Sequence, residues 1–115
     1  MAGPVVDGLT VRREVPNTSS ISASLGEDYR ILPGIREIPM SVFGGPKTVF
    51  YAADDYKRSE MLAQQIEASG EINPLIIVID EKGPYILEGS HRYVALWNLK
   101  KKSLPAMVVI DESEA

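Results

Sequence analysis

The sequence contains no cysteine and only one histidine, His91. The absence of cysteine excludes disulfide scaffolds, cysteine nucleophiles and thiol redox chemistry, and with a single histidine it also excludes zinc fingers. Any chemistry of this chain must therefore come from carboxylates, hydroxyl groups, Lys, Arg and one imidazole.

Positive charge and long apolar runs are also scarce. Twelve Lys and Arg residues against sixteen Asp and Glu residues give a net charge of −4. This balance argues against binding nucleic acid through bulk positive charge, but it allows a local phosphate pocket. The longest apolar run, Leu75–Ile79, is far shorter than the ~20 residues of a membrane helix. The first residues lack the basic start and apolar run of a signal peptide, so we expect a cytoplasmic protein without membrane contact.

The composition is that of one globular domain, with 44% hydrophobic and 24% charged residues in a chain of 115. Changes in amino-acid composition along the chain predict three parts. Residues 1–34 are polar and rich in turn formers, which predicts an irregular arm with at most short strands, such as Leu9–Val15. Residues 35–111 carry the patterned segments of the domain, and residues 112–115 form an acidic tail.

Helix and strand patterns alternate in the domain. Strands are predicted at Ile35–Phe43, Thr48–Ala52, Leu75–Asp80, Tyr85–Leu87 and Leu104–Ile110. Helices are predicted at Lys57–Ser69, where Gly70 would end the helix, and at His91–Leu99. The apolar, β-branched run of Leu75–Asp80 is typical of a strand covered on both faces, whereas Pro39 would confine the first strand to an edge or to its start. The order predicts an α/β or α+β fold with a small mixed sheet flanked by helices.

The segment Glu88-Gly89-Ser90-His91-Arg92 joins a strand directly to a helix. A helix N-terminus exposes unpaired backbone N–H groups and carries a partial positive charge, and a glycine before it lets a ligand approach the backbone. Ser90 can cap the helix or donate a hydroxyl, His91 can donate an N–H, and Arg92 has the planar fork that suits phosphate. Glu88 could orient a base, a water or a metal-bound oxygen. The alternative is an ordinary helix start, with Ser90 as N-cap and Arg92 paired with a surface carboxylate.

Four segments of the chain resemble the ParB/sulfiredoxin superfamily. Gly70–Val78 contains the "X-P-L-I-V" strand after a helix, and Tyr85–Ala95 contains the "G-x-H-R-x-x-A" box that opens the next helix. Ser103–Val109 is similar to the "I/L-P-A" closing strand, and Arg36–Phe43 is similar to the "V-P-L-S-x-L" opening strand. The resemblance covers about residues 35–111 and implies the fold of that superfamily.

The resemblance also implies a nucleotide site. In sulfiredoxin-like members, a "G-C-H-R" box binds ATP phosphates, and its Cys attacks a peroxiredoxin sulfinic acid. ParB-like members bind CTP with a related box, and other relatives are nucleases or ATP-dependent kinases of a small molecule. By position, Gly89, His91 and Arg92 match the phosphate-binding part of the box, and Ser90 takes the place of the Cys.

Two departures from the sulfiredoxin pattern limit what is carried over. A serine hydroxyl is a much poorer nucleophile than a thiolate unless a base activates it, and neighbouring His91 would not face Ser90 on a helix. We therefore expect no sulfiredoxin activity. Where sulfiredoxins direct a Lys, a Ser and a Thr of the preceding helix toward the nucleotide, this chain has Arg58, Met61 and Gln65. Arg58 keeps the positive charge. Because the hydroxyl groups are absent, the pose of the nucleotide and the identity of its base stay open.

Other candidate residues have two interpretations each. Asp54 and Asp55 could hold Mg²⁺ beside a nucleotide or could cap the helix that follows them. Tyr93 and Trp97 could stack on a nucleobase or belong to the core. No metal site made of His, Asp and Glu side chains is predicted for this chain.

Three functions follow from these observations. The leading hypothesis is an enzyme that binds ATP or CTP with Mg²⁺ through Gly89, Ser90, His91, Arg92 and Arg58 and hydrolyses it or transfers its phosphoryl group, with Glu88 and His91 as catalytic residues. The alternative is a metal-dependent nuclease that uses the same residues on DNA or RNA, which the net negative charge disfavours. The third is a non-catalytic module that binds a nucleotide or, through the N-terminal arm, a protein.

Overall fold

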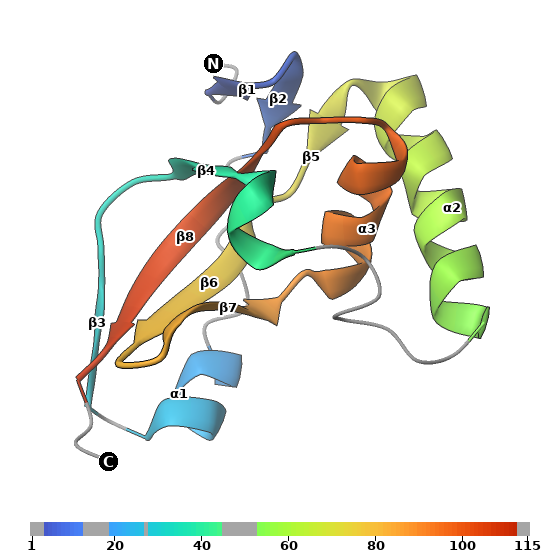
Figure 1. Cartoon of the computed structure of the whole chain (residues 1–115). Coiled ribbons are helices and arrows are strands. Elements are labelled where there is room, and N and C mark those ends of the chain that lie inside the picture. Colours follow the sequence, from blue (N-terminus) through green and yellow to red (C-terminus); the bar gives the residue numbers. More distant parts are fainter. Residues whose placement is uncertain (1–3, 13–18, 27, 45–52, 113–115) are drawn as a thin grey trace.

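The computed structural model describes residues 4–12, 19–26, 28–44 and 53–112 of the chain. The elements in chain order are β1 (Val5–Val6), β2 (Leu9–Val11), α1 (Ser19–Leu25), β3 (Tyr29–Ile31), β4 (Arg36–Pro39), the 3₁₀ helix η1 (Met40–Phe43), α2 (Ala53–Ser69), β5 (Glu71–Ile72), β6 (Leu75–Asp80), β7 (Gly83–Glu88), α3 (Ser90–Asn98) and β8 (Ser103–Asp111). Figure 1 shows their arrangement.

The main sheet is mixed and has five strands. β6 lies between β7, which is antiparallel to it, and β8, which is parallel to it. The opposite edge of β8 pairs antiparallel with β3 along Val109–Asp111 and with β4 along Ser103–Ala106. Because parallel neighbours need a crossover connection, the chain passes from β6 through the β7 hairpin and α3 before it returns as β8. The predicted small mixed sheet flanked by helices is therefore confirmed.

A second, three-stranded sheet joins the first strands of the chain, β1 and β2, to β5, which follows α2 (Figure 1). β1 and β2 form a short antiparallel pair, and β2 runs parallel to β5 with Thr10 opposite Glu71 and Val11 opposite Ile72. Val11 and Ile72 are both buried. The start of the chain is thus packed against the segment that follows α2.

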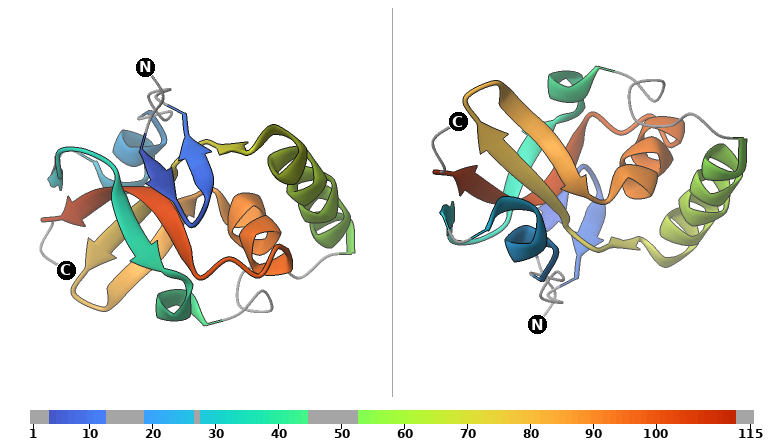
Figure 2. Two further views of the ribbon diagram at one scale, coloured as in Figure 1. Left: turned by 90° about the horizontal axis from the view of Figure 1, so that it is seen from above. Right: turned by 90° about the horizontal axis from the view of Figure 1, so that it is seen from below.

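Apolar side chains cover both faces of β6, as its sequence predicts. Leu75 and Ile77 belong to the main core with residues of α2 and α3, whereas Ile76 and Val78 pack with Ile21 of α1 on the other face. This division follows from the alternation of side chains along a strand. Seen from above and below, α2 and α3 lie side by side and apart from α1 (Figure 2).

The structure differs from the sequence prediction at several boundaries. The strand expected over Ile35–Phe43 ends at Pro39, and the chain continues as η1. Proline has a fixed φ and no N–H for a ladder, which explains the break. α2 begins at Ala53 rather than Lys57, and β7 is longer than predicted because Asp80 already pairs with Gly83. The strand expected at Thr48–Ala52 lies outside the described residues.

The described residues of segment 1–34 include a helix, α1, which the prediction of an irregular arm with at most short strands missed. They also include three short strands, of which β1 pairs with β2, β2 with β5 and β3 with β8. The predicted strand Leu9–Val15 is observed as β2 over Leu9–Val11, and its last three residues lie outside the described ranges. None of the helices in the described part of the chain is long and apolar enough to cross a membrane.

Candidate functional site

The junction between β7 and α3 depends on Gly89. This residue has φ 109° and ψ 21°, a left-handed conformation that favours glycine. A Cβ atom on Gly89 would lie 2.6 Å from Cγ of Leu75 and 3.1 Å from Nη2 of Arg92. The sequence suggested that this glycine leaves room for a ligand, but the space belongs to Leu75. Gly89 is instead required for the turn and for close packing of the helix start on β6.

The N-terminus of α3 has no side-chain cap. Gly89 is the N-cap residue, no side chain caps the helix there, and the first helical hydrogen bond runs from N–H of Tyr93 to the carbonyl of Gly89 at 2.9 Å. Ser90 is the first residue of the helix and not its N-cap, which corrects the alternative interpretation of this serine. The backbone N–H groups of the first turn have no acceptor within the helix. This end of α3 therefore has a positive potential that attracts anions.

Arg92 is a largely buried cation in the first turn of α3. Its Nη1 donates a hydrogen bond to the carbonyl oxygen of Pro74 at 3.1 Å. Burial lowers the pKa of Arg92, and the negative charge of Glu88 partly opposes this effect. Among the described residues no carboxylate lies within 4 Å of the guanidinium, so the expected alternative of a surface ion pair is not observed. A cation with little water around it attracts an anion more strongly than an exposed one does.

His91 contacts α2 rather than the residues next to it in sequence. Its Nε2 lies 3.1 Å from Oδ1 of Asp55, and the two side chains are 33% and 36% exposed. Asp55 lies inside the first turn of α2 and orients the imidazole, a role that sequence reasoning missed when it considered this residue as a cap or a Mg²⁺ ligand. The two residues are 36 positions apart, and no local pattern relates them.

The other α2 residues compared with the sulfiredoxin pattern do not all lie at the site. Arg58 is exposed, and Met61 is 62% exposed. Gln65, in contrast, lines a pocket together with Arg92. Glu88 ends β7 one residue before the glycine and is half-buried. The structure therefore brings Glu88, Ser90, His91 and Arg92 together around the start of α3 and leaves Arg58 on the helix surface.

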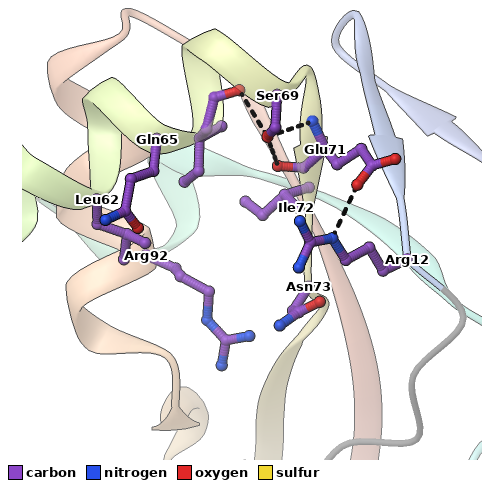
Figure 3. A pocket seen from close by; sticks show the side chains of 9 residues that line it. Arg12, Leu62, Gln65, Ser69, Glu71, Ile72, Asn73 and Arg92 are labelled. Carbon is purple, nitrogen blue, oxygen red and sulfur yellow. Dashed lines mark hydrogen bonds and ion pairs between the residues drawn. The ribbon is translucent and has the colours of Figure 1, made fainter.

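A pocket with a volume of about 190 Å³ lies between α2, α3 and the small sheet (Figure 3). The lining residues are Arg12, Leu62, Gln65, Ile66, Ser69, Glu71, Ile72, Asn73 and Arg92. The side chains of Arg12, Asn73 and Arg92 reach into it, and Nε of Arg12 lies 3.0 Å from Oε2 of Glu71. Oδ1 of Asn73 is buried without a hydrogen-bond partner among the described residues. Sequence reasoning missed Arg12 and Asn73, because nothing in their local sequence points to this site.

Tyr93 belongs to the core. It is fully buried, its hydroxyl donates to the carbonyl of Gly44 at 3.1 Å, and its ring meets Phe43 edge-on at 5.8 Å. Burial raises the pKa of this phenol. Trp97, with its ring centroid 6.4 Å from that of Tyr93, is 43% exposed. A stacking role for Tyr93 is therefore wrong.

The donor set of the described residues does not form a metal cage. No group of three or more His, Asp or Glu side chains in those ranges could hold an ion. The carboxylates near the start of α3 are Asp55 and Glu88. Because Mg²⁺ is often held by one or two carboxylates together with substrate phosphates, these residues fit a Mg²⁺ ion only when a phosphorylated ligand supplies most of its oxygens.

Comparison with known proteins agrees with this geometry. Residues 19–115 match the family model of the ParB N-terminal domain, so the chain belongs to the ParB N-terminal domain family. A crystal structure of sulfiredoxin from Arabidopsis thaliana has a similar fold, with a TM-score of 0.50 and 23% identity over 66% of this chain and 84% of that chain. No curated protein sequence matches the chain. The superfamily resemblance expected from the sequence is thus confirmed, and the family match starts at α1, after β1, β2 and Arg12.

Proposed function

We propose that the start of α3 binds the phosphates of a nucleoside triphosphate, either ATP or CTP. The observation that carries this proposal is the half-buried guanidinium of Arg92 beside a helix N-terminus without a side-chain cap. Both features attract an anion, and a guanidinium presents two parallel N–H donors to a phosphate group. The family membership supports the same ligand class, because nucleotide binding is what the resemblance of the box implies.

The arrangement of side chains supports phosphoryl transfer or hydrolysis. Water attacks the γ-phosphorus, the bond to the bridging oxygen breaks, and the products are a nucleoside diphosphate and phosphate. Arg92 stabilises the charge that spreads over the phosphate oxygens, and His91, oriented by Asp55, lies at the same helix start. Glu88 accepts the proton of the attacking water. A Mg²⁺ ion would neutralise phosphate charge and would be held by the phosphates with Asp55.

Calorimetric titration with ATP, CTP and GTP, each with and without Mg²⁺, tests the binding step. We expect one nucleotide to bind, and we expect Arg92→Ala to weaken binding by about tenfold or more, which is the value of a lost charge-assisted hydrogen bond. Arg30→Gln is the matched control, because Arg30 is an exposed arginine of β3 that pairs with Glu112. Absence of binding to all three nucleotides, or equal binding by Arg92→Ala and the parent, would disprove the site.

Release of phosphate from the bound nucleotide tests the catalytic step. We expect Glu88→Gln to keep the affinity within about twofold and to slow turnover by at least about a hundredfold, the usual range for a general base. If the parent protein binds nucleotide without turnover, the domain is a binding module and the catalytic part of the proposal is wrong.

A further inference from the structure

Arg12 reaches the candidate site from outside the family domain. The family match begins at residue 19, yet Arg12 lines the same pocket as Arg92. Figure 3 shows the two guanidinium groups on opposite sides of Asn73. A second cation therefore reaches this pocket from a segment that lies N-terminal to the matched family domain.

The backbone of Arg12 is held in place by β5. Its N–H donates to the carbonyl of Ile72 at 2.9 Å, and the N–H of Thr10 donates to the carbonyl of Gly70 at 2.9 Å. Val11 between them is fully buried. These contacts fix the start of the Arg12 side chain at the rim of the pocket, so its position does not depend on the ion pair with Glu71.

The ion pair between Arg12 and Glu71 is weak enough to be exchanged for a ligand. Its side chains are 44% and 48% exposed, and exposed ion pairs contribute little to stability. A phosphate that enters the pocket would meet two guanidinium groups, of which that of Arg92 is half-buried. Arg12 can therefore turn from the carboxylate of Glu71 to a phosphate without loss of the fold.

Asn73 lines the same pocket as the two arginines. Its Oδ1 is buried and has no donor among the described residues, so this oxygen is closed to a ligand. The side-chain amide nitrogen of Asn73 is a donor that suits an anion held between the two guanidinium groups.

We infer that Arg12 is a ligand-binding residue, and that the N-terminal segment made of β1, β2 and Arg12 completes the site at α3. This inference rests on the proposed nucleotide site and adds a specific residue to it. The anionic group of the nucleotide lies between Arg12 and Arg92 in the pocket that Asn73 also lines. The segment is then a functional part of the site.

Titration of the full chain and of Arg12→Gln with the nucleotide that binds best tests the inference. We expect Arg12→Gln to weaken binding by about fivefold or more, as for loss of one charged hydrogen-bond donor. Arg30→Gln is the matched control, since it removes an arginine from an exposed Arg–Glu pair in β3 and is expected to bind like the parent. Glu71→Gln, which removes the competing charge, is expected to bind at least as tightly as the parent.

Hydrogen exchange gives a second readout that a purely structural role would not change. Nucleotide should slow amide exchange at Thr10 and Arg12 in the parent, and to a smaller degree in Arg12→Gln. If the parent binds nucleotide but Arg12→Gln and Arg30→Gln have the same affinity, this inference is wrong and the proposed function stands. If the parent and all variants fail to bind any nucleotide, the proposed function itself is wrong.

Discussion

Gly89 meets two independent requirements that only glycine satisfies. Its φ of 109° is unfavourable for other residues, and a Cβ atom would collide with the side chain of Leu75 at 2.6 Å. The collision is with a fully buried residue of β6, so it cannot be relieved at the surface. Substitution here should therefore disturb the packing of α3 on the sheet as well as the turn.

We expect Gly89→Ala to lower the free energy of unfolding by about 2–4 kcal/mol, from backbone strain together with overpacking. Urea denaturation measures this change. Gly34→Ala is the matched control, because Gly34 also has a positive φ of 79° but has no atom within 4 Å of the new Cβ. The control should lose only about 1 kcal/mol from strain, and equal losses in the two variants would contradict the role of Leu75.

Tyr93→Phe removes the hydroxyl that donates to Gly44. At neutral pH we expect a loss of about 1 kcal/mol, the usual net value of one hydrogen bond. Because burial raises the pKa of Tyr93 in the folded protein, the folded state keeps this proton more tightly than the unfolded state. The parent should therefore be fully stable below the ordinary tyrosine pKa of about 10 and should lose stability as the pH rises above it.

The measurement is the urea midpoint of the parent and of Tyr93→Phe at pH 8 and at about pH 11. Other tyrosines, including Tyr85, whose pKa is also raised, affect both proteins alike and cancel in the difference. The stability gap between the two proteins should narrow at the higher pH. A gap that is the same at both values would show that Tyr93 does not titrate differently in the folded state.

Residues of the site could be predicted from the sequence only where they share one local pattern. Ser90, His91 and Arg92 follow a strand and open a helix, so their position near a helix N-terminus was predictable from their types and order. Asp55 meets His91 through the packing of α2 on α3, and Arg12 reaches the pocket beside Arg92 through the pairing of β2 with β5. These pairings depend on contacts between distant parts of the chain, and a single sequence does not show them.

α1 is a short helix whose one fully buried anchor among its described side chains is Ile21. Ile21 is fully buried against Ile76, Val78 and Val109, while Ser24 on the same helix is exposed. A helix of seven residues is marginal on its own in water, so tertiary contacts must stabilise it. Ile21, with Leu25 packed against the same cluster, therefore holds the helix on the second face of β6.

We expect Ile21→Ala to lower the free energy of unfolding by about 2–4 kcal/mol. It should also speed amide exchange throughout α1 more than in α2 or α3. Urea denaturation and hydrogen exchange with mass spectrometry measure the two effects. Ser24→Ala should change neither by more than about 0.5 kcal/mol, and unchanged exchange of α1 in Ile21→Ala would contradict the proposed anchor.

The predictability of the elements depended on how strongly their patterns repeat. The continuous apolar run of β6 predicted its bounds, and Gly70 marked the end of α2, because both signals are local and strong. α1 was missed because four of its seven residues are serine and only Ile21 and Leu25 provide helical spacing. The pairing of β2 with β5 was missed because a strand of two residues has no detectable period.

The whole molecule carries a net charge of −4, which affects its affinity for polyanions. Non-specific DNA binding depends on neutralising many phosphates with Lys and Arg. We therefore expect the domain to bind duplex DNA of random sequence more weakly than about 100 µM at about 0.15 M salt. Fluorescence anisotropy with a labelled duplex measures this affinity, and micromolar binding at that salt concentration would contradict the expectation.

β8 is the partner of β3, β4 and β6, although it follows all of them in the chain. During synthesis, β3, β4 and the edge of β6 that faces away from β7 have no partner until Ser103–Asp111 has been made and has left the ribosome. The nascent domain therefore exposes the edges of β3 and β4 from early in its synthesis and the free edge of β6 from the time that strand is made, which is the state in which chains aggregate. The main sheet can form fully only after β8 has been made. Chaperones that shield open sheet edges would act before that moment.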